Sequence, residues 1–226
     1  MQPHIKRKFD HVLARSLSMG LSAEELLQDS MKALTEGDRP LSERVRSRRP
    51  ALSREFGLVE KEIYTFIAMH QPLPYDLEKI ACTLSFIASM DRICRLGDAI
   101  AEAVIARLAH ISWAFVLKAF PLQCIADEAI SMVHDTLTAF GAPSKGQIGR
   151  HAERNDHVKA MEMQVLRAGV EWCAREPRDI HVIEQVLLVT RALADSAANS
   201  TSIAEKIRMT YSGEGRGIPS GADRSP

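Results

Sequence analysis

The sequence predicts an all-α protein built as two tandem three-helix bundles packed side by side. Three observations predict this class. Apolar residues recur at helical spacing along almost all of the 226 residues. No segment alternates apolar and polar residues long enough to form a strand. Short breaks that contain glycine or proline separate the periodic segments, as they do between helices.

The first periodic segment predicts a helix of about 30 residues that ends near Gly37. Only Glu24 interrupts its apolar stripe. The stripe consists of Ile5, Phe9, Val12, Ser16, Gly20, Leu27, Met31 and Leu34. Gly37 can take the left-handed conformation that commonly ends a helix.

Two further helices complete the first half. A stripe running to the break at 70–74 predicts the second helix, which Pro50 is expected to start or kink because proline cannot donate the helical hydrogen bond. The third helix is expected from about 75 to 110. Its two adjacent apolar stripes are typical of the central helix of a bundle.

The second half is predicted to contain three helices after the break at Phe120-Pro121. They are expected at 124–140, 150–174 and 177–210, with a loop over 141–149. The Gly- and Ser-rich composition of 212–226 predicts a disordered tail.

The two halves carry traces of an internal repeat. Sliding the chain by 103 positions puts Pro74 on Pro177 and Asp76 on Asp179, and a shift of 106 puts Asp29 on Asp135 in the first helices. Helix lengths and break positions agree with these shifts. We therefore expect one three-helix unit over 1–110, a second over 111–211 and a tail over 212–226.

Composition excludes several classes of protein. Lys+Arg and Asp+Glu both number 29, which argues against nucleic acid as the main partner. The four cysteines form no CxxC pair, so a disulfide framework or zinc knuckle is not expected. Charged residues interrupt the most apolar stretch, 99–120, which falls short of a transmembrane segment. Without a signal-peptide pattern, a cytoplasmic location is expected.

The chain carries no sequence motif of a known enzyme class: no P-loop, no GxGxxG after a strand, no GxSxG and no HExxH. We therefore expect a protein that is not an enzyme.

Four segments together resemble the PhoU family of phosphate-uptake and phosphate-signalling regulators. They are 19–34, the HQPLPYDL turn at 70–77, the DRI tripeptide at 91–93, and 133–140, and the resemblance spans roughly 8–212. It implies two tandem three-helix repeats and a non-enzymatic negative regulator. It also implies binding to the ATPase subunit of a phosphate ABC transporter and to a phosphate sensor kinase, and a homodimer.

The resemblance also implies a divalent metal or iron, held by motif carboxylates at positions i and i+4 of the third helix. Here the motif keeps Asp91 but has Arg95 at the second position. The aligned positions of the second half are Ala194 and Ala198, so that motif has lost both carboxylates.

The residues themselves offer two interpretations of the third helix. Asp91 and Asp98 fall on an otherwise apolar seam, so they could form a reduced metal site with Glu60 of a facing helix. Alternatively, Asp91 pairs with Arg95 at i+4 and Asp98 lies at the edge of the seam.

Three further groups each have a functional and a structural interpretation. The basic stretch of Arg44, Arg46, Arg48 and Arg49 could dock an acidic partner or form a solvated face. The pair Asp195 and Asn199 could hold a displaced second site or lie on a polar face. The cluster His151, Glu153, Asp156 and His157 could ligate a metal or begin a solvated helix.

Two hypotheses from other functional classes stay open on sequence alone. One is an all-helical metal-dependent enzyme built on Asp91 and Asp98. The other is a plain dimerisation scaffold, since core and interface stripes have the same pattern.

Overall fold

The computed structural model describes residues 3–105, 112–143 and 149–212, and within these ranges all regular structure is helical. The first half contains α1 (Pro3–Glu36), α2 (Arg39–His70) and α3 (Pro74–Ile105). The second half contains α4 (Trp113–Ala119), α5 (Leu122–Gly141), α6 (His151–Arg175), the 3-10 turn η1 (Pro177–Asp179) and α7 (Ile180–Ser212). The predicted all-α class is confirmed.

Local sequence signals explain the first helix boundary. Gly37 has φ +66°, so the predicted left-handed C-cap of α1 is present. Asp38 then caps α2, because its side chain accepts a hydrogen bond from the Leu41 N–H at 2.9 Å.

Two local expectations need correction or addition. Pro50 lies inside α2, so it does not start that helix. The short helix α4 was not predicted, although Ser112 accepts a hydrogen bond from the Phe115 N–H as a typical N-cap. The predicted end of the third helix at 106–110 and the predicted disorder over 213–226 lie outside the described residues.

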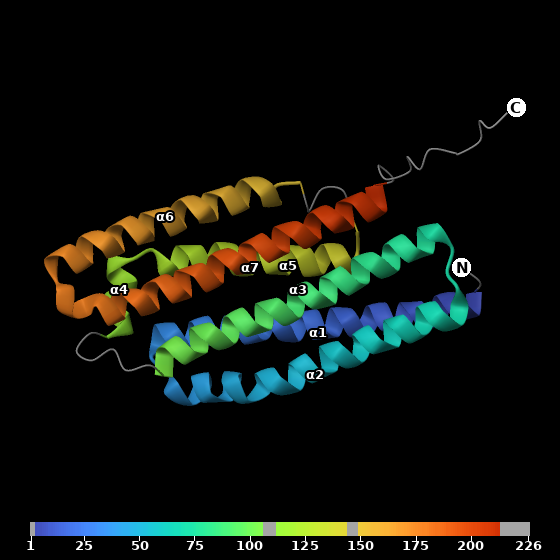
Figure 1. Cartoon of the computed structure of the whole chain (residues 1–226), viewed down its shortest axis with the longest axis horizontal. Helices are drawn as coiled ribbons and strands as arrows, with labels where there is room; N and C mark the ends of the chain where they lie inside the picture. Colours follow the sequence, from blue (N-terminus) through green and yellow to red (C-terminus); the bar gives the residue numbers. More distant parts are fainter. Residues whose placement is uncertain (1–2, 106–111, 144–148, 213–226) are drawn as a thin grey trace, which may run out of the picture.

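The long helices form two groups of three that pack against each other (Figure 1). Helices α1, α2 and α3 contact one another, as do α5, α6 and α7. Between the groups, α3 packs along α7 and α1 along α5. The assignment of 1–110 and 111–211 as related repeats stays a prediction. None of the helices in the described ranges has an apolar stretch that could span a bilayer.

One shared core joins the two groups. Phe86 of α3 stacks on Phe140 of α5 with ring centroids 3.8 Å apart and planes 8° apart. Gly20 of α1 lies beside this stack. A Cβ atom there would come within 2.8 Å of Phe86 and 2.5 Å of Leu137. The groups can approach this closely only because position 20 has no side chain.

Glu24 interrupts the apolar stripe of α1 because it faces the other group. Its side chain is largely buried, and its Oε1 lies 3.1 Å from Nδ1 of His134 on α5. Gln28 donates a second hydrogen bond at 3.2 Å. The carboxylate thus has polar partners at the junction, as a buried charge requires.

Gly20→Val should destabilise the protein by about 1–3 kcal/mol, because the new methyl groups would collide with Phe86 and Leu137. Gly57→Ala is the matched control. Gly57 lies in the interior of α2 with no atom near its would-be Cβ, so alanine should stabilise by about 0.5–1 kcal/mol. Urea denaturation followed by circular dichroism measures both. Equal unfolding free energies for Gly20→Val and the wild type would contradict the close packing.

Candidate functional site

Asp91, the first predicted site residue, lies between α3 and α2 and already has two partners. Its Oδ1 accepts a hydrogen bond from the Ser53 hydroxyl of α2 at 2.6 Å. Its Oδ2 accepts from Arg95 Nη1, also at 2.6 Å. The i+4 pairing considered from sequence is therefore present. Ser53 was missed, because nothing in the sequence indicates which side of α2 faces Asp91.

Asp98, two turns further along α3, faces the basic stretch of α2. Its Oδ1 lies 3.4 Å from Arg46 Nε. The contact lacks hydrogen-bond geometry, so this buried oxygen forms no hydrogen bond within the described chain. Arg46 Nη2 also lies 3.7 Å from Glu102. A single guanidinium thus lies close to two carboxylates of α3.

Cys94 lies between the two aspartates on α3 and is buried. Burial raises the pKa of its thiol to about 12, and nearby Asp91 adds to the rise, while Arg49 and Arg95 oppose it. Because a metal ligand must be the thiolate, Cys94 is poorly suited to bind a cation at neutral pH.

Glu60, the third predicted ligand, is exposed on α2 and accepts a hydrogen bond from the Tyr64 hydroxyl at 3.0 Å. This bond raises the pKa of Tyr64. Glu60, Asp91 and Asp98 do not come together, and the described residues contain no group of three potential metal-ligating side chains. Arginines instead supply the positive charge beside both aspartates. These contacts favour arginines over a metal ion beside the two aspartates, and the predicted ligand set stays a prediction.

The four arginines of the predicted docking stretch face different directions. Arg44 is exposed. Arg46 is paired with α3, as described above, and Arg48 spans to α1, where it contacts Glu25 at 2.7 Å and Asp29 at 3.4 Å. Arg49 is half-buried, and its Nε forms no hydrogen bond within the described chain. Arg46 and Arg48 therefore help to hold the helices of the first group together.

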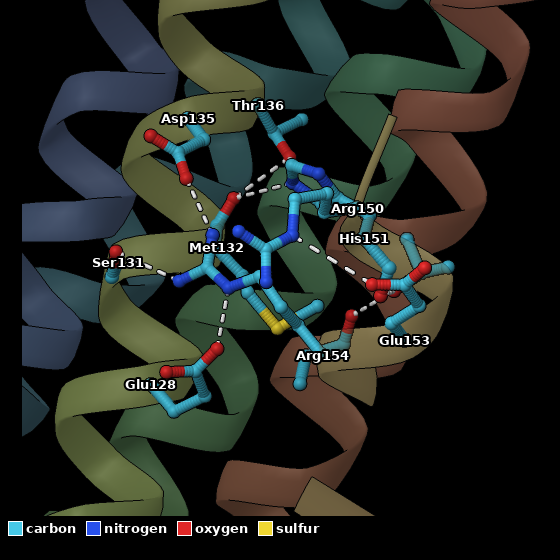
Figure 2. Close-up of polar contacts among 11 residues, drawn as sticks. Glu128, Ser131, Met132, Asp135, Thr136, Arg150, His151, Glu153 and Arg154 are labelled. Atoms are coloured by element: carbon cyan, nitrogen blue, oxygen red, sulfur yellow. Dashed lines mark hydrogen bonds and ion pairs between the residues drawn. The ribbon is translucent and has the colours of Figure 1, made fainter. Parts of the chain in front are cut away.

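The second group contains a corresponding and more extensive arginine site (Figure 2). Arg154 of α6 reaches across to α5, where it contacts Glu128 and donates to Asp135 at 2.6 Å and Ser131 at 2.9 Å. The shift of 106 positions that aligns Asp29 with Asp135 also aligns Arg48 with Arg154. The same ion pair therefore joins the first two long helices of each group, which supports the proposed repeat.

Arg154 is more enclosed than Arg48, with 22% against 41% of the side chain exposed. Burial by itself lowers the pKa of Arg154, but the hydrogen bonds to Glu128 and Asp135 outweigh it, so the pKa is raised. Sequence reasoning missed Arg154, although applying the repeat shift to Arg48 would have found it.

The predicted cluster at the start of α6 separates into a buried and an exposed part. The expectation of a solvated helix start is wrong for His151, which is only 2% exposed. Its Nε2 lies 3.2 Å from the Met132 carbonyl oxygen, which can only accept, so Nε2 carries a proton (Figure 2). Glu153, Asp156 and His157 are exposed.

The predicted pair Asp195 and Asn199 also contacts other groups of the same chain. Asp195 lies 3.2 Å from Arg191 on its own helix and 3.9 Å from Arg92 of α3. Asn199 donates to the Asp195 backbone carbonyl at 2.6 Å rather than to its carboxylate. This arrangement favours a structural role in the contact between α3 and α7.

Arg154→Met should cost about 2–4 kcal/mol of stability, because it leaves two carboxylates of α5 without their shared cation. Arg48→Met, at the matched and more exposed position, should cost about 1 kcal/mol or less. Urea denaturation compares the two variants. A larger loss of unfolding free energy for Arg48→Met than for Arg154→Met would contradict the assignment of Arg154 as the more stabilising arginine.

We expect chelation to leave the protein unchanged. The thermal midpoint should be the same with and without EDTA, because arginines already neutralise Asp91 and Asp98. Asp91→Asn should leave that EDTA insensitivity intact. A midpoint that falls with EDTA in the wild type, but not in Asp91→Asn, would instead establish a metal site at this residue.

The fold and these sites define a class: a two-group helical bundle whose interhelical acids are neutralised by its own arginines. Comparison with known proteins agrees with the helical fold. The family profile of the PhoU domain matches residues 17–104. A Rhizobium meliloti (strain 1021) relative, "Phosphate-specific transport system accessory protein PhoU homolog", is 28% identical over 219 residues, covering 93% of this chain and 90% of the relative. A Serratia marcescens accessory protein PhoU is 21% identical, with 95% and 88% covered.

Solved structures agree in fold. The crystal structure of PhoU from Pseudomonas aeruginosa matches with a TM-score of 0.84 at 21% identity, covering 92% of this chain and 99% of that one. The phosphate transport system regulatory protein PhoU from Streptococcus pneumoniae matches with a TM-score of 0.83 at 17% identity, with 93% and 98% covered. Residues 17–104 thus match the PhoU domain, and nine-tenths of the chain is similar in sequence and in fold to proteins named PhoU.

Proposed function

We propose that this protein is a non-enzymatic regulator of phosphate transport and of phosphate-responsive signalling. One observation carries the proposal: similarity extends over nine-tenths of both chains to a relative named as a phosphate-specific transport accessory protein. Similarity over this length includes both helix groups and their junction, so it is not confined to one shared helical hairpin.

The protein acts by binding. Its partners are the ATPase subunit of a phosphate ABC transporter, a phosphate sensor kinase, or both, and it meets them in the cytoplasm as a homodimer. Two features support a binding role. Long helices present extended surfaces, and grooves open between neighbouring helices at the surface. In this proposal the bundle reduces phosphate uptake or phosphate signalling by binding to its partner.

The site chemistry supports regulation over catalysis. A metal-dependent hydrolase needs several ligands around one ion and an open coordination position. Asp91 and Asp98 instead face arginine side chains, and Glu60 is exposed on another face. No specific contact among the described residues favours the enzyme hypothesis.

A deletion strain grown in excess phosphate tests the function. Alkaline phosphatase activity should rise when the gene is removed and fall again when it is restored, because the regulator represses the phosphate response. A restored Gly57→Ala gene is the matched control, since that substitution touches no other side chain and should repress like the wild type.

Two results would contradict the proposal. Unchanged phosphatase activity after deletion, with unchanged phosphate uptake, would remove the protein from phosphate regulation. Failure of the purified protein to bind either the transporter ATPase or the kinase of its host would remove the proposed partners while leaving a phosphate role to another mechanism.

A further inference from the structure

An open groove runs between the N-terminal part of α1 and the C-terminal half of α2. Its volume is about 760 Å³. Val12 and Phe66, both buried, form its floor. Leu58 and Met69 line it with 59% and 68% of their surface exposed. Large apolar side chains exposed together along a groove are typical of a surface that another molecule covers.

The rim of this groove is strongly basic. It contains Arg7, Lys8, His11, Lys61 and His70 against a single acidic residue. That residue, Glu62, is already paired with Arg15 at 2.6 Å. Within the described chain, no carboxylate pairs with the Arg7, Lys8 or Lys61 side chains. The groove therefore carries uncompensated positive charge on a protein whose formal net charge is zero.

The second helix group has an equivalent groove that differs in its apolar lining and in the charge of its rim. The shift of 106 positions takes Phe66 to Trp172 and His70 to Glu176, and both of these residues line the second groove. Its volume is only about 410 Å³. Phe120 stacks on Trp172 with ring centroids 5.7 Å apart, whereas the aligned position in the first group is Ala14.

This contrast shows that an open basic groove is not a necessary result of packing these helices. In the second groove the positions of Thr65 and His70 are taken by Glu171 and Glu176 and that of Met69 by Arg175, so its rim is mixed in charge where the first is mainly basic. Aromatic side chains close the second groove from within. In the first group Phe9 packs on Phe66 with ring centroids 5.6 Å apart, as Phe115 does on Trp172, but Ala14 stands in the place of Phe120. Leu58 and Met69 remain exposed there.

We propose that the α1–α2 groove is a docking site for an acidic amphipathic helix of a partner protein. The apolar face of that helix covers Leu58, Phe66 and Met69, and its flanking carboxylates face Lys61 and the basic residues of α1. This inference rests on the proposed function for the existence of a partner, and it adds the surface and the chemistry of the contact.

The dimensions of the groove suit a helix. Leu58 and His70 are twelve residues apart on α2, a length of about 18 Å at 1.5 Å per residue. That length accommodates about three turns of a partner helix, with apolar anchors at i, i+3 or i+4 and i+7. A concave groove between two helices fits such a cylinder, whereas a flat bilayer surface would leave the floor at Val12 and Phe66 uncovered.

Fluorescence anisotropy with purified full-length protein tests the proposal. The probe is a fluorescein-labelled, 18-residue designed helix with leucines along one face and glutamates on both flanks. A second probe carries lysines in place of the glutamates. The acidic probe should bind, and the basic probe should bind at least about tenfold more weakly, because the rim charges attract one and repel the other. Binding of the acidic probe should weaken as salt is raised.

Matched variants locate the binding. Lys61→Glu should weaken binding of the acidic probe about tenfold. Arg167→Glu should not weaken it, because Arg167, the exposed residue of α6 that the 106-residue shift aligns with Lys61, lies outside the groove. Leu58→Ser with Met69→Ser should abolish detectable binding. Met209→Ser, which changes a similarly exposed methionine on α7, should leave binding intact. All of these positions are exposed, so the variants should fold like the wild type.

Several outcomes would overturn the proposal. One is absence of binding by the acidic probe, and another is equal binding by Lys61→Glu and Arg167→Glu. Lys61-dependent binding to phosphatidylglycerol vesicles without probe binding would identify the groove as a membrane contact. Self-association that Met69→Ser abolishes, again without probe binding, would identify a second copy as the occupant. These assays use purified protein, so their failure is distinct from a failure of the phosphatase test.

Discussion

The close approach of α1 to the opposite helix group is the constraint on which the rest of the structure depends. It requires the absence of a side chain at Gly20, beside the stack of Phe86 on Phe140. With this contact in place, the two groups share one core, and α3 lies along α7 (Figure 1). Glu24 and His134 then complete the junction with a polar contact at its edge.

Both helix groups contain the same type of ion pair between their first two long helices. An arginine in the first half of the second long helix contacts an aspartate of the first: Arg48 with Asp29, and Arg154 with Asp135. The shift of 106 positions relates the two pairs. The pairs differ in burial, so the same contact contributes little in the first group and more in the second. Two similar helix groups can thus keep the same ion-pair geometry while the contribution of that pair to stability differs.

The sequence predicted features that depend on local spacing. Helical periodicity predicted the long helices, Gly37 predicted the end of α1, and i+4 spacing predicted the pairing of Asp91 with Arg95. It could not predict contacts that depend on how helices rotate against each other. Ser53 on Asp91, Arg46 near Asp98 and the burial of His151 belong to this kind. Periodicity identifies an apolar face but does not identify the helix that covers it.

The two grooves show how one frame supports different surfaces. Both lie against the C-terminal end of the second long helix of a group, and both have an aromatic residue at the same register, Phe66 in the first and Trp172 in the second. In the second group the chain before α5 breaks at Pro121, and Phe120 turns inward onto Trp172. In the first group α1 continues without a break; its Phe9 packs on Phe66 with ring centroids 5.6 Å apart, and Ala14 stands at the position of Phe120. The break that separates α4 from α5 therefore adds a second aromatic contact to one groove, and the continuous α1 leaves the other larger.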